Sequence, residues 1–113
     1  MNNFINPQLT KQVIIGTKSQ SRRKLFKMMN LKFQYRSANI NEKTVKNLKN
    51  DKYDALKIAK EKATHLSKKN KNKIIITFDT TILHMGKTIY KCHTKECCKN
   101  TLKSFNNTSH NLY

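Results

Sequence analysis

The chain contains few of the residues that bend or cross-link a polypeptide: two glycines, one proline and three cysteines among 113 residues. The number of cysteines is odd, Cys97 and Cys98 are adjacent, and none belongs to a Cys-x-x-Cys pair. These features exclude the usual spacings of a disulfide framework and of a structural zinc site. We therefore expect Cys92, Cys97 and Cys98 to be free intracellular thiols, with a metal site involving His93 or His110 as the less favoured alternative.

Long apolar runs are absent as well. No segment approaches the roughly 20 apolar residues that a membrane-spanning helix needs. The first residues show neither the basic region nor the long apolar region of a secretory signal. We expect a single domain over residues 1–113, located in the cytoplasm and without a membrane partner.

Acidic residues are also scarce, with six Asp and Glu against 24 Lys and Arg and a net charge of +18. Such a charge favours nucleic-acid binding, because clustered cations release counterions from a phosphate backbone. Only three of the basic residues are arginine, however, and lysines alternate with asparagines along the whole chain instead of forming one stripe. We interpret most of this charge as a solvated surface that attracts polyanions, including nucleotides, without specificity.

Among the features that are present, residues 16–26 are the most informative. They follow the apolar run Val13-Ile14-Ile15, which is typical of a buried strand, and they lead into a segment with helical spacing. A strand-to-helix turn with a glycine, small hydroxyl residues and cations is suited to phosphate, because N–H groups and the helix dipole favour an anion there. Arg22 and Arg23 can add bidentate bonds to phosphoryl oxygens. Alone, the segment is explained equally well by a basic surface loop before a capped helix.

The hydrophobic pattern predicts alternating strands and helices, with an irregular stretch over residues 38–50 that includes a short helix near residues 44–48. We expect strands at residues 12–16, 32–37 and 74–78, a hairpin from residues 81–85 and 88–90 that turns at Met85-Gly86-Lys87, and helices at residues 21–30, 53–68 and 95–105. This order indicates an α/β fold with a mixed sheet and flanking helices. The run at 74–78 is continuously apolar, as in strands that are buried on both faces.

The helix at 53–68 has Leu56, Ala59, Ala63 and Leu66 on one predicted face. Lys62 borders this apolar face and does not lie among the solvated lysines opposite. That position is unusual for a lysine whose only role is solubility.

Asp79 lies at the end of the predicted strand 74–78. In open α/β sheets, ligands bind beyond the carboxyl ends of the strands, so this position favours a functional role. Asp79 is therefore the best candidate for a general base or a metal ligand. A turn-forming aspartate before Thr80 is the structural alternative, and on position alone the two interpretations are about equal.

Six segments together resemble the motifs of one family. In chain order they are Thr17-Lys-Ser19-Gln-Ser-Arg22-Arg-Lys-Leu25, Asn39-Ile-Asn41-Glu42, Ala59-Lys-Glu61-Lys62-Ala63, Thr77-Phe-Asp79-Thr80, Gly86-Lys-Thr-Ile89-Tyr-Lys91-Cys92 and Phe105-Asn-Asn-Thr-Ser-His110-Asn-Leu-Tyr113. They resemble, in the same order, the Ser-x-Ser-Pro-Arg-Arg-x-x-Leu, Asp-x-Asp-Glu, Ala-x-Glu-Lys-Ala, Gly-Ala-Asp-Thr, Gly-x-x-Leu-x-Lys-Pro and Leu-Ser-Gly-x-x-His-x-Val-Tyr motifs of the Maf family of nucleoside triphosphate pyrophosphatases. The resemblance spans nearly the whole chain but only the first half, or somewhat more, of the family pattern, and we expect the C-terminal lobe to be missing.

The chain departs from the family pattern at several positions. Ser21 stands where the first arginine is usual, which leaves Arg22 as the matching cation. Asn39 and Asn41 replace both aspartates of Asp-x-Asp-Glu, and Cys92 replaces the proline after the lysine.

The resemblance implies a Maf-like fold and hydrolysis of a nucleoside triphosphate to the monophosphate and pyrophosphate with Mg²⁺ or Mn²⁺. It implies that Asp79 is the catalytic base and also a metal ligand, and that Glu42 assists with the metal. The residues that it implies for substrate binding are Ser19, Arg22, Arg23, Lys62, Thr80 and Lys91. The Asp-Thr pair is the pattern of members that act on dTTP, UTP or modified pyrimidine nucleotides.

Two alternatives stay open. The chain could be a non-catalytic basic protein that binds nucleic acid or other polyanions, although no RNP-like aromatic pair, GXXG loop or zinc-finger spacing supports this. It could also be an inactive Maf remnant whose activity was lost with the second lobe. Whether it forms a homodimer is a further open question.

Overall fold

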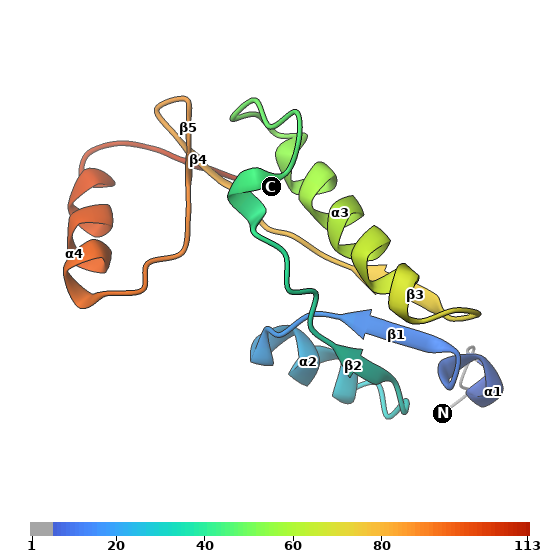
Figure 1. Ribbon diagram of the computed structural model, residues 1–113. Coiled ribbons are helices and arrows are strands. Elements are labelled where there is room, and N and C mark those ends of the chain that lie inside the picture. Colours follow the sequence, from blue (N-terminus) through green and yellow to red (C-terminus); the bar gives the residue numbers. More distant parts are fainter. Residues whose placement is uncertain (1–5) are drawn as a thin grey trace.

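The computed structural model describes residues 6–113, which form helices and short strands (Figure 1). In chain order the elements are α1 (Pro7–Thr10), β1 (Val13–Gly16), α2 (Gln20–Lys27), β2 (Gln34–Arg36), the 3₁₀ helix η1 (Glu42–Thr44), α3 (Asp54–Lys69), β3 (Ile74–Thr77), β4 (Ile82–His84), β5 (Lys87–Ile89), α4 (Lys95–Ser104) and β6 (Asn111–Leu112). The α/β class predicted from the sequence is confirmed. None of the helices in this described part has the length and hydrophobicity of a membrane span.

The first three strands form a parallel sheet in the order β2-β1-β3. Strand β1 is central and fully buried, since Ile14 and Ile15 are only 1% and 0% exposed. In the pairing of β1 with β3, Val13 faces Ile74 and Gly16 faces Thr77. The prediction that these two apolar strands are neighbours in one sheet is therefore confirmed, and their carboxyl ends meet at one edge.

Helices α2 and α3 lie on opposite faces of the parallel sheet (Figure 1). Helix α2 connects β1 to β2, whereas the path from β2 to β3 crosses β1 and includes α3. Right-handed crossovers in opposite directions place their helices on opposite faces. The connections therefore diverge between β1 and β3, and in open α/β sheets this divergence opens a crevice at the carboxyl ends of the strands.

The remaining strands form a separate antiparallel sheet in the order β5-β4-β6. The predicted hairpin is confirmed: His84 pairs with Lys87, and the two intervening residues, Met85 and Gly86, have φ values of 51° and 73°. A two-residue turn with two positive φ angles matches the right-handed twist of the strands that it joins. Helix α4 follows β5, and Phe105 at its end contacts the His84 ring at a centroid distance of 5.0 Å.

The prediction that the strand at 74–78 is buried on both faces is wrong. Ile74 is 45% exposed and Ile76 is 37% exposed, whereas Ile75 is half-buried. In the described sheet β3 is an edge strand. Helix α3 covers the face that carries Ile75 and Thr77, because Thr77 Oγ1 donates a hydrogen bond to the Ala59 carbonyl at 2.6 Å. The opposite face of β3 is open.

The predicted buried face of the helix at 53–68 is also partly wrong. Leu56 is 67% exposed, and the buried apolar positions of α3 are Ala55, Ile58 and Leu66. The predicted helical periodicity is correct, but the observed buried face is rotated by about one residue from the predicted one. Lys62 therefore lies on the buried stripe and not at its border. The short helix expected near residues 44–48 is wrong in its bounds, because the 3₁₀ helix η1 spans Glu42–Thr44 and Val45 is already extended.

We predict that Gly16→Ala destabilises the fold, because this position allows close contact between β1, α3 and β3. A Cβ at Gly16 would lie 2.5 Å from Leu66 Cδ1 and 2.7 Å from Thr77 Cγ2. Overpacking of this kind costs about 1–3 kcal/mol, which urea denaturation followed by circular dichroism will measure. In a Leu66→Ala background the loss should be smaller, since one clashing atom is removed. Equal losses in both backgrounds would contradict a steric cause.

Candidate active site

A cavity of about 300 Å³ opens beyond the carboxyl ends of β1 and β2, and Asp79 and Thr80, which follow β3, are not among its lining residues. Residues from the loop after β1, the segment between β2 and η1, and helix α3 line it. The lining residues are Gly16, Thr17, Lys18, Ser19, Arg22, Ser37, Ala38, Asn39, Ile40, Asn41, Glu42, Lys62 and Lys91. The three predicted cations Arg22, Lys62 and Lys91 therefore share one cavity, although they come from three distant parts of the chain.

The loop after β1 is held by its own hydroxyl groups. The Thr17 hydroxyl accepts a hydrogen bond from the Ser19 N–H at 3.1 Å, and the Ser19 hydroxyl caps α2 by accepting from the Arg22 N–H at 3.4 Å. The first-turn N–H groups of a helix have no acceptors within the helix and favour an anion at this end. The loop thus places the amino end of α2 at the cavity, as the sequence pattern predicted.

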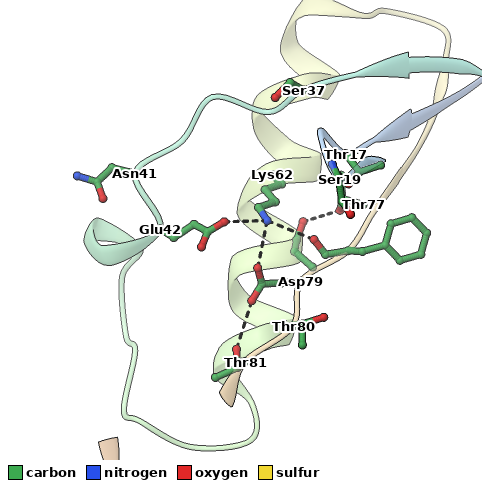
Figure 2. A network of polar contacts seen from close by, with 12 residues as sticks. Thr17, Ser19, Ser37, Asn41, Glu42, Lys62, Thr77, Asp79, Thr80 and Thr81 are labelled. Atoms are coloured by element: carbon green, nitrogen blue, oxygen red, sulfur yellow. Dashed lines mark hydrogen bonds and ion pairs between the residues drawn. The ribbon is translucent and has the colours of Figure 1, made fainter. Parts of the chain in front are cut away.

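Lys62 is at the centre of a polar network beside the cavity (Figure 2). Its Nζ lies 3.0 Å from Glu42 Oε1 and 3.1 Å from Asp79 Oδ1, and it donates to the Phe78 carbonyl at 3.3 Å. Asp79 Oδ2 accepts a further hydrogen bond from the Thr81 hydroxyl at 3.2 Å. A single ammonium group therefore joins carboxylates from η1 and from the end of β3.

The burial of these groups explains why the network is needed. The side chains of Lys62 and Asp79 are only 13% and 7% exposed, whereas that of Glu42 is 41% exposed. A buried charge without a partner is strongly destabilising, so each buried member depends on the other. Lys62 is positioned by its place on the buried stripe of α3, which directs its long side chain toward the strand ends.

The pKa of the Asp79 carboxyl is raised above its ordinary value. Burial is the main cause, and the nearby Glu42 charge acts in the same direction. The hydrogen bond and positive charge of Lys62 oppose the rise. Burial thus makes Asp79 a stronger proton acceptor than an exposed aspartate, while Lys62 favours its ionised form.

The two arginines of the first turn of α2 have different surroundings. Arg22 lines the cavity and donates through Nη2 to the Thr80 hydroxyl at 2.7 Å, which connects the start of α2 to the segment after β3. Arg23 donates through Nε to the Thr17 carbonyl at 2.8 Å and lies over the Tyr35 ring. Arg23 does not line the cavity, so its observed contacts support the loop, and the substrate-binding role expected for it stays a prediction.

Residues 12–113 match the family model described as Maf-like protein. The chain belongs to the Maf family. A curated relative from Pelagibacter ubique (strain HTCC1062), named nucleoside triphosphate pyrophosphatase, is 30% identical over 109 residues. The match covers 92% of this chain and 56% of the relative, so the chain spans little more than half the length of that relative.

The site also contains groups that the sequence analysis missed. Thr81 holds Asp79, the Phe78 carbonyl accepts from Lys62, and Ser37 lines the cavity. Thr81 was detectable, because a hydroxyl two residues after an aspartate is a common local hydrogen-bond partner. The Phe78 carbonyl and Ser37 left no signal, since their positions depend on how separate segments pack.

The carboxylates of this Maf site have the chemistry expected of ligands for a divalent cation. Mg²⁺ is usually held by one or two carboxylates together with substrate phosphates, and Glu42 and Asp79 supply two. Within residues 6–113 no group of three or more His, Cys, Asp or Glu side chains is arranged to hold a metal ion. The protein side chains fit a metal that shares its ligands with a phosphate group, and they do not form a complete cage.

We predict that Lys62→Met raises the pKa of Asp79 further, because it removes the cation that favours the carboxylate and leaves the repulsion from Glu42. A ¹³C NMR titration of the aspartate carboxyl signals will measure the change. In the variant the pKa of Asp79 in the folded state then exceeds its unfolded value by more than in the wild type. The free energy of unfolding should therefore fall by more as the pH rises from the unfolded to the folded pKa of Asp79. Lys60→Met, an exposed change on the same helix, is the control. An Asp79 pKa that is unchanged or lower in Lys62→Met would contradict the assigned role.

Proposed function

We propose that the chain is a nucleoside triphosphate pyrophosphatase that releases pyrophosphate and a nucleoside monophosphate. The observation that supports this most directly is the convergence of Arg22, Lys62 and Lys91 on one cavity, next to the partly neutralised pair Asp79 and Glu42. Three cations suit a triphosphate, and the buried carboxylate of Asp79, which contacts the cavity-lining Lys62, suits a proton acceptor. A cytoplasmic location is part of this proposal, because that compartment holds the nucleoside triphosphate pool.

Substrate binding in this proposal depends on the cations and the helix end. Arg22 binds phosphoryl oxygens in a bidentate manner, whereas Lys62 and Lys91 act as compact point charges. Ser19 keeps the start of α2 in place, so that its N–H groups face the anion. Because Lys62 already contacts two carboxylates, an entering phosphate competes with them for its ammonium group and loosens its hold on Asp79.

The chemical step is attack of water on the α-phosphorus. A bond forms between the water oxygen and phosphorus, the bond from that phosphorus to the bridging oxygen breaks, and pyrophosphate leaves. Asp79 accepts the proton of the water through a carboxylate oxygen, and its raised pKa suits this role. Arg22 and Lys62 stabilise the charge that develops on the phosphoryl oxygens.

Glu42 and Asp79 are the residues that would hold Mg²⁺ or Mn²⁺ in this site, together with phosphate oxygens. The cation, when bound, supplies neutralisation of the triphosphate charge. Asn39 and Asn41 line the same wall of the cavity as Glu42, and they add no negative charge there. We propose that metal binding depends largely on the nucleotide and that turnover is slow.

The nucleotide preference belongs to the same proposal. Thr80 directly follows Asp79 and accepts the hydrogen bond from Arg22. The Asp-Thr pair supports a pyrimidine nucleotide such as dTTP or UTP, or a modified form of one. Polyanion binding by the surface lysines is the alternative, and it is distinguished by a steep dependence on salt and the absence of nucleotide preference.

We predict that Asp79→Asn lowers pyrophosphate release about 10²–10⁴-fold, since the amide keeps the shape of the side chain but cannot accept a proton. Release from dTTP and UTP will be measured with Mg²⁺ or Mn²⁺ and with enzyme in excess of nucleotide. Nucleotide binding, measured by calorimetry, should remain largely intact. Asp51→Asn is the matched control, because Asp51 is outside the cavity and an asparagine can also accept the bond from the Tyr53 N–H. Equal turnover by Asp79→Asn and the wild type would remove Asp79 from the mechanism.

We predict that pyrophosphate raises the melting temperature more than chloride does at equal ionic strength, because only a phosphoryl anion fits the three cations. At about ten times its Kd a ligand adds about 1.4 kcal/mol of stability. Thermal unfolding by circular dichroism will measure the shift. Arg22→Ala should reduce it, whereas Lys68→Ala, at the exposed far end of α3, should not. Identical shifts with both anions would show that the cavity does not bind pyrophosphate specifically.

A further inference from the structure

The cysteines lie outside the cavity and have no role in the proposed reaction. Cys92 is half-buried in the segment between β5 and α4, and Cys97 and Cys98 are exposed in the first turn of α4. All three are free thiols, and the Sγ atoms of Cys92 and Cys97 lie 2.7 Å apart. The segment before α4 and the first turn of α4 thus bring two thiols into direct contact.

Hydroxyl groups on both sides keep this pair in place. Thr94 caps α4 and accepts a hydrogen bond from the Cys97 N–H at 3.1 Å, which fixes the turn that presents Cys97. Thr101 lies four residues after Cys97, on the same face of the helix. Its Oγ1 is 3.3 Å from Cys92 Sγ. One face of α4 therefore holds Cys92 between Cys97 and Thr101.

The protonation of the two thiols is unequal. Hydrogen bonds from Cys97 and then from Thr101 lower the pKa of Cys92. The pKa of Cys97 is raised, mainly because Cys97 donates the hydrogen bond to Cys92. The thiolate is the nucleophile in thiol chemistry, so Cys92 is the attacking group and Cys97 is the second thiol. Cys98 is turned about 100° around the helix from Cys97. Its hydrogen bond to Cys92 also lowers the pKa of Cys92, but it is the smallest of the causes.

We propose that Cys92 and Cys97 form a reversible disulfide by exchange with a low-molecular-weight disulfide of the glutathione type. In the first step the Cys92 thiolate attacks one sulfur of glutathione disulfide, a mixed disulfide forms, and one glutathione thiolate leaves. In the second step Cys97, after losing its proton to solvent, attacks Cys92 Sγ, and the second glutathione leaves as a thiolate that takes up a proton. The two protein thiols are oxidised and one glutathione disulfide is reduced to two thiols, so atoms and electrons balance.

The location of the bond connects it to the cavity. Cys92 directly follows Lys91, which lines the cavity, and the disulfide would tie this segment to α4. The backbone on one side of Lys91 would then be fixed by a covalent bond. The inference does not depend on the proposed catalytic activity, since it requires only the thiols and their neighbours.

The test uses the full chain, incubated with glutathione disulfide, alkylated with iodoacetamide and analysed by mass spectrometry. The reduced chain should take up three alkyl groups, since it has three cysteines, and the oxidised chain should take up one. Trypsin cuts after Lys91, Lys95 and Lys99, so the disulfide should appear as peptides 92–95 and 96–99 joined together. Dithiothreitol should separate them and restore all three thiols.

Serine variants assign the partners. Cys97→Ser should retain one glutathione on Cys92 and form no internal disulfide, because the second thiol is gone. Cys98→Ser is the matched control, and it should form the internal disulfide at the wild-type rate, within about twofold. Far-UV circular dichroism will verify that each variant is folded.

Three outcomes would overturn the proposal. The oxidised wild type could retain all three thiols, Cys98→Ser could lose the disulfide while Cys97→Ser keeps it, or glutathione could spread equally over the three cysteines. Each result would show that the contact between Cys92 and Cys97 does not direct thiol exchange.

Discussion

The architecture of the site depends on one ammonium group, that of Lys62. It projects from the buried face of α3 and lies between Asp79, at the end of β3, and Glu42, in η1. Without this cation a nearly buried aspartate would face a second carboxylate with no compensating charge, and such an arrangement is strongly destabilising. The same contact joins a helix, a strand end and an otherwise irregular segment. It therefore shapes the cavity, and it also opposes the rise in the pKa of Asp79, the proposed proton acceptor.

The sheet supplies the rigid frame for this contact. Strand β1 is fully buried at the centre, and the order β2-β1-β3 places the ends of β1 and β3 at the point where the connections diverge to opposite faces. The loop after β1 and the residues after β3 therefore face each other, and Arg22 connects them through its bond to Thr80. This is the geometric basis of the phosphate-binding site that we propose for a Maf chain spanning little more than half the length of its curated relative.

Much of this arrangement was predictable from local patterns, and the errors have identifiable causes. The apolar β1, the Met85-Gly86 turn and the strand-end position of Asp79 depend on signals within a few residues, and the structure has all three. The open face of β3 was missed because an apolar run does not reveal whether its strand is central or at an edge. The buried face of α3 was predicted about one residue away from its position, because Leu56 and Ile58 fit neighbouring helical stripes equally well. In the structure α3 packs against β3 and β1 with Ile58 buried.

The sequence by itself determined the element types, the order of the motifs and therefore the membership in the Maf family. It also identified Lys62 as unusual, since a cation beside an apolar stripe is costly to bury unless an anion accompanies it. Only the tertiary structure decided which anions those are, that Arg22 faces the cavity while Arg23 braces the loop through Thr17, and that Cys92 contacts Cys97. These pairings join segments that come together only in the folded chain. A single hydrogen bond or ion pair between such segments produces no repeating pattern in the sequence from which it could be predicted.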